Sequence, residues 1–294
     1  MLEKVKRFYE AKYKKLLIIP FLMLFLALMQ VGYQFASTGE FMNRGVSLKG
    51  GISVAIPEHT MPIIELQEIF NNNYPKADIS VRSISQTGLL IEASDLTQEQ
   101  VLQVLKEQFP NLQKGDYSVG ELGSALGESF FRETIFVLFL SFILMGVVVF
   151  ITFRVPAPSL AVILAAFCDI VVTLAVVNMM GIKISSAGIA AFLMLIGYSV
   201  DTDVLLSTRV LRRTEGTVMD GVYSAIRTGF MMTSTTLVAL LAGLFLANND
   251  TIFQIMLILF IGLIVDLIMT WIQNVGVLRL YIERKEKSQK ATAP

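Results

Sequence analysis

Six long apolar stretches dominate the hydrophobic pattern of this chain. They cover roughly residues 16–36, 131–153, 157–180, 185–208, 229–247 and 252–274. A helix that crosses the hydrocarbon core of a bilayer needs about 20 mostly apolar residues, and each stretch has that length. We therefore predict a multi-pass α-helical membrane protein with six transmembrane helices. The apolar core of the first stretch is too long for a signal peptide and no small-residue cleavage pattern follows it, so we expect a retained anchor.

The basic residues of the short connections predict the orientation of the helices. Lys and Arg gather in residues 4–15, after the second and fourth helices, and in residues 279–290. The loop after the third helix has only Lys183, and the loop after the fifth has no basic residue. Since cytoplasmic loops carry the excess of Lys and Arg, both termini are predicted to be cytoplasmic and residues 37–130 to lie outside the cell membrane. The predicted division is 1–36 (N-terminus and first helix), 37–130 (external domain), 131–280 (helices two to six) and 281–294 (cytoplasmic tail).

Between the first two helices the pattern changes to that of a small α+β domain. Strands are predicted at 51–56, 78–83, 88–93 and near 116–120, and helices at 61–73 and 97–109. Gln86-Thr87-Gly88 is a turn signal between the two middle strands, and Thr97 with Gln100 fits a capping box at the start of the second helix. The order β-α-β-β-α-β is that of the ferredoxin-like motif. We predict a ferredoxin-like domain within residues 45–120.

Composition excludes several classes of function. The chain is 54% hydrophobic and only 16% charged, against about 25% charged residues in soluble domains. Its 24 basic and 24 acidic residues balance, whereas a nucleic-acid binder needs a basic excess. His59 and Cys168 are the only residues of their kinds, which excludes an intramolecular disulfide and a His-rich metal site. We expect Cys168 to be a packed small hydrophobe and His59 to be solvated in a turn. With no nucleotide-binding loop or nucleophile motif, the chain is predicted not to be an enzyme and to hold no cofactor.

Four acids inside the predicted spans are the candidate chemistry: Asp169, Asp201, Asp203 and Asp266. An ionisable group at mid-membrane costs about 2.5–3.5 kcal/mol on insertion scales, so such residues are rare without a partner or a function. At about 100° per residue, Asp201 and Asp203 point about 200° apart. One of them should face the bundle axis, and the other a neighbouring helix or the cytoplasmic end. Ser199, Asp203 and Ser207 form one polar strip.

The fifth helix adds a base and a run of hydroxyl groups. Arg227 stands near its start, and the hydroxyl-bearing residues are Thr228, Thr233, Ser234, Thr235 and Thr236. A carboxyl group out of water can hold a proton near neutral pH, and a nearby Arg favours its release. Acids, hydroxyls and an Arg on inner helices therefore suit a proton path, with Arg227 packed near the acidic fourth helix. The alternative is structural, since hydroxyls also bind helices together and a single Asp can be architectural.

The same residues carry a family resemblance. The motifs are Gly45-Val-Ser-Leu-Lys-Gly-Gly51, Cys168-Asp-Ile170, Ile196-Gly-Tyr-Ser-Val-Asp-Thr-Asp-Val204, Arg227-Thr228 with Thr233-Ser-Thr-Thr-Leu237, and Thr270-Trp-Ile-Gln-Asn-Val-Gly-Val-Leu-Arg279. Together with the length and loop sizes, they resemble the SecD/SecF family of protein-export membrane proteins, within the resistance-nodulation-division superfamily, and its archaeal-type SecF branch most. Asp201 falls on the aspartate position of SecD, while the usual SecF aspartate position holds Thr202.

The resemblance implies a function and a set of partners. It implies a subunit that associates with SecD and with the Sec translocon channel, in contact with membrane lipid and an exported polypeptide but with no nucleic acid. It also implies use of the proton motive force to assist translocation, with Asp201 as the first candidate for the proton carrier. Two alternatives remain open: an accessory that stabilises a SecD complex without conducting protons, and one half of a small-molecule exporter.

Overall fold

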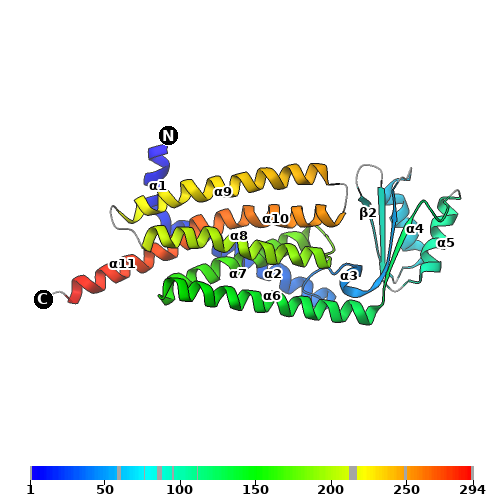
Figure 1. Cartoon of the computed structure of the whole chain (residues 1–294), viewed down its shortest axis with the longest axis horizontal. Helices are drawn as coiled ribbons and strands as arrows, with labels where there is room; N and C mark the ends of the chain where they lie inside the picture. The colour runs from blue at the N-terminus through cyan, green and yellow to red at the C-terminus, as the bar shows by residue number, and fades with distance from the viewer. Residues whose placement is uncertain are drawn as a thin grey trace.

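The chain folds into a bundle of membrane-length helices and a smaller α+β domain (Figure 1). The computed structural model describes residues 2–57, 61–75, 77–84, 88–94, 96–110, 112–211, 217–247 and 250–292. His59 and the predicted turn residues Gln86 and Thr87 lie outside the described residues. The N- and C-termini lie at one end of the bundle and the α+β domain lies at the other (Figure 1).

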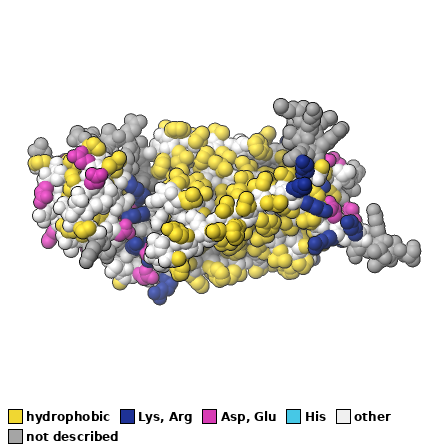
Figure 2. Space-filling model, turned by 180° about the vertical axis from the view of Figure 1, so that it is seen from behind, with side chains coloured by type: hydrophobic (Ala, Val, Ile, Leu, Met, Phe, Trp, Pro, Cys, Tyr) yellow, Lys and Arg dark blue, Asp and Glu magenta, His cyan; other side chains and the backbone are white. Residues whose placement is uncertain are grey.

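Six helices in the described part are long and apolar enough to cross a membrane, which confirms the predicted number. The helices of the bundle are α1 (Leu2–Leu16), α2 (Ile18–Thr38), α6 (Ser124–Phe153), α7 (Pro156–Met179), α8 (Ser186–Leu211), α9 (Val218–Leu246), α10 (Asp250–Ile268) and α11 (Val275–Thr292), with a π-helix, η1 (Met269–Asn274), between the last two. Hydrophobic side chains cover the middle of the bundle, whereas charged side chains gather towards its ends (Figure 2).

Several helices extend beyond their apolar stretches. α6 begins at Ser124 rather than at 131, inside the stretch assigned to the external domain, and α9 begins at Val218 rather than at 229. The predicted tail, 281–294, is helical as far as Thr292. Hydropathy marks the part of a helix that is apolar, but a helix continues through polar turns until the backbone is capped or broken. α9, for instance, starts at a capping box in which the Thr217 side chain accepts from the backbone N–H of Asp220.

The α+β domain has the predicted ferredoxin-like order. Its elements are β1 (Gly51–Ile56), α4 (Ile63–Asn73), β2 (Asp78–Ile84), β3 (Gly88–Ser94), α5 (Gln98–Gln108) and β4 (Ser118–Leu122). The strands form one antiparallel sheet in the order β2-β3-β1-β4. Side chains of β1 alternate between the core and the other face, and the predicted capping box of Thr97 and Gln100 is present. Only the last strand is displaced, from 116–120 to 118–122.

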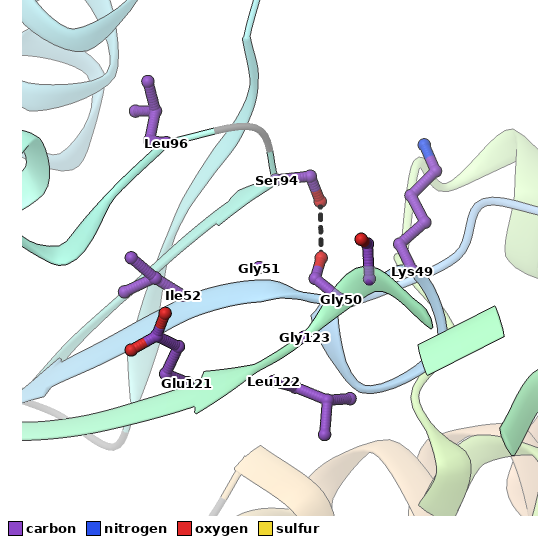
Figure 3. A pocket seen from close by; sticks show the side chains of 10 residues that line it. Lys49, Gly50, Gly51, Ile52, Ser94, Leu96, Glu121, Leu122 and Gly123 are labelled. Carbon is purple, nitrogen blue, oxygen red and sulfur yellow. Dashed lines mark hydrogen bonds between the residues drawn. The ribbon is translucent and has the colours of Figure 1, made fainter. Parts of the chain in front are cut away.

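Two adjacent glycines let the domain join the bundle closely. After the short helix α3 (Val46–Lys49), Gly50 and Gly51 adopt φ angles of +85° and +133°, which favour glycine. A Cβ atom at Gly50 would lie 2.4 Å from Cα of Ser124, the first residue of α6. Beside this contact, the Ser94 hydroxyl donates to the Gly50 carbonyl at 3.2 Å, at the edge of a cavity of about 380 Å³ (Figure 3).

Ion pairs also hold the domain against the bundle. Asp78, at the start of β2, binds Lys183 of the α7–α8 loop at 2.7 Å and Lys49 of α3 at 3.1 Å. Glu40 also binds Lys49, at 3.5 Å. Burial opposes ionisation of Asp78, but the hydrogen bonds and charges of Lys183 and Lys49 outweigh it and lower the pKa of Asp78. The carboxylate therefore stays charged and bound to both bases at neutral pH.

We predict that Asp78→Asn loosens this junction. Each partly exposed ion pair contributes about 1 kcal/mol or less, so the chain should stay folded while backbone amides of residues 45–51 and 183–186 exchange hydrogen faster. Because the folded-state pKa of Asp78 is lowered, its contribution is complete above the unfolded value of about 3.9 and is lost as the pH falls through the folded value. Wild-type protein should thus loosen in acid, and the variant, which keeps only the Glu40 carboxylate on Lys49, should show a smaller step.

Hydrogen exchange measured by mass spectrometry at a series of pH values tests this prediction. Asp116→Asn is the matched control. The Asp116 carboxylate accepts a hydrogen bond from the backbone N–H of Gln113, within its own loop. If Asp78→Asn exchanged like wild type at neutral pH, the ion pairs would not hold the junction.

Candidate functional site: a buried acidic cluster

Three carboxyl groups meet in the centre of the helical bundle. Asp169 comes from α7, Asp203 from α8 and Asp266 from α10, and their exposed fractions are 1%, 0% and 0%. The three helices pack directly on one another. The polar groups are thus surrounded by the apolar side chains that make the same helices membrane-compatible. Cys168, next to Asp169, is free and buried among hydrophobic residues, as predicted.

Asp169 lies between a hydroxyl group and a second acid. The Ser199 hydroxyl of α8 donates to its Oδ2 at 2.5 Å. The carboxyl group of Asp266 is near enough to interact electrostatically with that of Asp169. Two ionised carboxylates have no proton to place between them, so a hydrogen bond between the two acids requires that one of them carries a proton.

Two threonine hydroxyls link Asp266 to its surroundings. The Thr270 hydroxyl is 2.9 Å from Asp203 Oδ1 and 3.1 Å from Asp266 Oδ1. The Thr202 hydroxyl is 3.2 Å from Asp266 Oδ2 and 2.8 Å from the Ser199 carbonyl. A hydroxyl group has one proton to donate, so each threonine hydroxyl donates a hydrogen bond to only one of its two acceptors at a time.

Asp203 receives its second donor from the π-helix. The side-chain amide of Asn274 donates to Asp203 Oδ1 at 2.7 Å, the same oxygen that Thr270 contacts. The other oxygen, Oδ2, has no partner among the described residues, and neither does the hydroxyl group of Ser207, one turn further along α8. On α7, Asp169 Oδ1 and the Thr173 hydroxyl likewise have no partner among the described residues. Buried polar atoms are normally satisfied, so these four atoms are open hydrogen-bonding positions within the cluster.

The cluster has more acceptors than donors. Three carboxyl groups offer six oxygens, and the side chains that donate to them are those of Ser199, Thr202, Thr270 and Asn274. No Lys or Arg of the described residues pairs with any of the three acids. Since isolated buried charge is costly, protons are the available means of neutralising this cluster.

Asp201, the first candidate in the sequence, is not part of the cluster. Its side chain is exposed on the surface of α8, while Asp203 points inward with Ser199 and Ser207. The expected divergence of the two acids is therefore present, and so is the buried strip at Ser199, Asp203 and Ser207. The spacing gives the angle between Asp201 and Asp203 but not which of them faces the core.

The expectation that Arg227 packs against the acidic helix is wrong. Arg227 is exposed on α9, more than two turns after the helix start, and pairs with none of the acids among the described residues. The hydroxyls of Thr228, Thr235 and Thr236 donate to carbonyl groups of their own helix. Only Thr233 of that run is buried at 3% exposure. The hydroxyls that reach the acids come instead from α8 and η1.

Sequence reasoning missed Thr202, Thr270 and Asn274 as members of the site. The signal was present for two of them, because Thr270 and Asn274 follow Asp266 at intervals of four residues, and each interval turns an α-helix by only about 40°. Thr202 carried a different signal, since it occupies the usual SecF aspartate position of the family motif, but its contact with Asp266 depends on how α8 and α10 pack.

Comparison with known proteins agrees with this architecture. Residues 100–284 match the family described as "Protein export membrane protein SecD/SecF, C-terminal". The protein-export membrane protein SecF of Pyrococcus furiosus is 37% identical over 289 residues, which covers 97% of this chain and 96% of that protein. The SecF protein of Methanocaldococcus jannaschii is 35% identical, with 92% and 96% covered.

Solved structures show the same fold. The crystal structure of SecDF, a translocon-associated membrane protein from Thermus thermophilus, superimposes with a TM-score of 0.76 at 20% identity. The match covers 94% of this chain but only 38% of the SecDF chain. A second structure of SecDF, in a super-membrane-facing form, gives a TM-score of 0.55. With a matching family model and relatives of nearly equal length, the chain belongs to the SecD/SecF family of protein-export membrane proteins.

Proposed function

We propose that this chain acts in protein export as a SecF-type subunit beside a SecD-type partner, and that Asp169, Asp203 and Asp266 carry the protons that drive its work. A role in export with SecD is supported by relatives named SecF that match over almost the whole chain and by the SecDF fold. The proton step rests on one observation. Three fully buried acids share hydroxyl and amide donors and have no basic partner among the described residues.

The proton gradient can supply the required energy. An elementary charge that crosses 100 mV releases about 2.3 kcal/mol, comparable to the cost of about 2.5–3.5 kcal/mol for one ionisable group at mid-membrane. Taking up a proton removes the repulsion between facing carboxylates such as Asp169 and Asp266. Releasing it restores the repulsion. The packing of α7 against α10 then differs between the two states.

Thr270 connects the two parts of the cluster. When Asp266 is protonated, it needs no donor, and the Thr270 hydroxyl can donate to Asp203. When Asp266 is ionised, the same hydroxyl can turn to it, since both oxygens lie within about 3 Å of the hydroxyl group. A proton that moves between Asp203 and Asp266 thereby changes which carboxylate Thr270 serves.

A set of contacts joins α10, which carries Asp266, to the α+β domain. Gln254, near the start of α10 and 3% exposed, donates to the Lys183 carbonyl at 2.6 Å and accepts from the backbone N–H of Ser185 at 3.0 Å. Lys183 pairs with Asp78 of the domain. In the same loop, Ile184 exchanges backbone hydrogen bonds with Asn43 and Gly45. Displacement of α10 therefore reaches the domain through residues 183–185, the kind of discrete linkage that coupling requires.

Exposed polar groups within the spans support a SecD-type partner. Asp201 and Tyr198 are exposed on α8 beside Gly197. Lipid penalises such groups, whereas a partner helix can pair them and can approach closely at a glycine. Membrane transporters of this kind are commonly built from two related halves. A second half placed on this face would cover the polar groups.

The proposed orientation puts both termini in the cytoplasm and the α+β domain outside. The basic residues of the N-terminus and of α11 lie at the end of the bundle opposite the domain (Figure 1), and the side richer in Lys and Arg is normally cytoplasmic. The domain would then meet an exported polypeptide emerging from the Sec translocon channel. The competing proposal keeps this assembly but makes the chain a structural accessory that conducts no protons.

We predict that Asp203→Asn abolishes stimulation of export by a proton gradient and leaves the complex assembled. Asn keeps the size of the side chain and an oxygen for Thr270 and Asn274, but it cannot exchange a proton. Export into vesicles with and without an imposed gradient measures the effect. The matched control is Asp201→Asn, the same change two residues away on the exposed face of α8, which should retain the response. A full response in Asp203→Asn would favour the accessory, and loss only in Asp201→Asn would move the proton site to the partner interface.

We further predict that Gly197→Leu weakens binding of the SecD-type partner at least about tenfold, or 1.4 kcal/mol, without unfolding this chain. A Cβ atom at Gly197 would meet nothing within 4 Å inside the chain, so a larger side chain points into the space that a partner helix would occupy. Gly32→Leu is the control, since Gly32 is equally open but lies on α2. Co-purification and thermal unfolding of each variant separate the two effects. Equal recovery of the partner with Gly197→Leu and Gly32→Leu would place the interface elsewhere.

A further inference from the structure

The π-helix η1 interrupts the regular hydrogen bonding of the sixth span beside the acidic cluster. In an α-helix, the backbone N–H of Val275 would donate to the Trp271 carbonyl four residues before it. Here it donates to Thr270 O and Ile272 O instead. The Trp271 carbonyl therefore does not accept the hydrogen bond from Val275 that it would have in an α-helix. The hydroxyl group of Tyr9, from the N-terminal helix α1, donates to this carbonyl.

The wider π turn places Thr270 and Asn274, which both donate to Asp203, on one side of the helix. Asp266 and Asn274 are eight residues apart, and at about 100° per residue an α-helix would turn them about 80° away from each other. A π turn, whose hydrogen bonds span five residues, rotates less per residue. Asn274 consequently stays on the face of Asp266 and Thr270. Asn274 and Thr270 reach the same oxygen of Asp203, at 2.7 and 2.9 Å.

We infer that Tyr9 is a positioning residue for the acidic cluster: its hydroxyl holds η1 in the register that aims Thr270 and Asn274 at Asp203. Tyr9 touches none of the three acids and acts through the backbone of Trp271. This deepens the proposed function, because its effect on proton transfer rests on the cluster being the proton site. Its effect on the π segment does not depend on that proposal.

The surroundings of η1 fix the point at which Tyr9 acts. The Trp271 ring packs on Gly229 of α9, where a Cβ atom would come within 2.5 Å of the ring. Leu17, which follows α1, packs on Gly276, and a Cβ atom there would lie 2.6 Å from its side chain. These apolar contacts fix the lateral position of η1 in the bundle. They do not choose between α and π hydrogen bonding, whereas a donor to the Trp271 carbonyl favours the π arrangement.

α1 is itself anchored, so it can hold Tyr9 in position. The Tyr223 hydroxyl of α9 donates to the Glu10 carboxylate at 2.8 Å, and Arg279 of α11 donates to the Glu10 carbonyl at 3.3 Å. The Arg279 guanidinium also lies 3.9 Å from the centre of the Tyr13 ring. Tyr9 thus connects a helix outside the acidic cluster to the donors of Asp203. Displacing α1 would withdraw its hydroxyl from Trp271.

Tyr9→Phe tests the inference with one atom removed. In the full chain with its partner, amides of residues 269–276 should exchange hydrogen about fivefold faster, as expected for the loss of one hydrogen bond. The pH midpoint of gradient-driven export should also move to higher pH, because a site with misaligned donors stabilises negative charge less well. Tyr33→Phe is the matched control: it removes a hydroxyl group from a side chain that is 77% exposed on α2, outside η1 and outside the anchor of α1. It should leave both readouts at wild-type values.

The outcomes distinguish this inference from the proposed function. Unchanged exchange at 269–276 in Tyr9→Phe overturns the inference whatever export does. Faster exchange with an unmoved pH profile, in an assay where Asp203→Asn abolishes the gradient response, also overturns it, because Tyr9 is then structural only. If wild-type export shows no gradient response, the proposed function fails, and the exchange experiment alone decides whether Tyr9 holds the π segment.

Discussion

The burial of three carboxyl groups inside a membrane bundle constrains the rest of this structure. Each carboxyl group needs donors, and in this position they must come from neighbouring helices. Ser199 and Thr202 on α8 supply Asp169 and Asp266, while Thr270 and Asn274 supply Asp203. Helices α7, α8 and α10 therefore have one workable mutual register, and the sixth span departs from α geometry at the place where two donors must reach one oxygen.

The connection between bundle and domain follows a different physical rule. Glycine permits the close backbone contact, because side chains at Gly50 or Gly127 would overlap the opposite backbone. Charge supplies the second attachment, through Asp78 and its two lysines. A junction made of both a steric fit and ion pairs can be stiff at neutral pH and still respond to a small displacement of the 183–185 loop.

Local patterns predicted most of the fold and only part of the site. Strand alternation and the Thr97 capping box depend on neighbours in sequence, so the ferredoxin-like order could be predicted. Asp203 could not be separated from Asp201, because helical period gives relative angles and the direction of the core comes from packing. The π turn at Met269–Asn274 leaves no mark in hydropathy, and neither does the hydrogen bond from Tyr9, whose partner lies 262 positions away. Arg227 lies on an outward side of α9, and the direction of that side is again set by packing.

The division between buried and exposed polar groups also bears on how two subunits would share the work. Every side-chain donor to the three acids found in the described residues belongs to this chain, whereas Asp201 and Arg227 face outward. Under the proposed function, a partner covers this outer face and influences proton transfer by moving α8 and α9. Since α8 carries Asp201 on one side and Asp203 on the other, a small rotation of that single helix changes both environments at once.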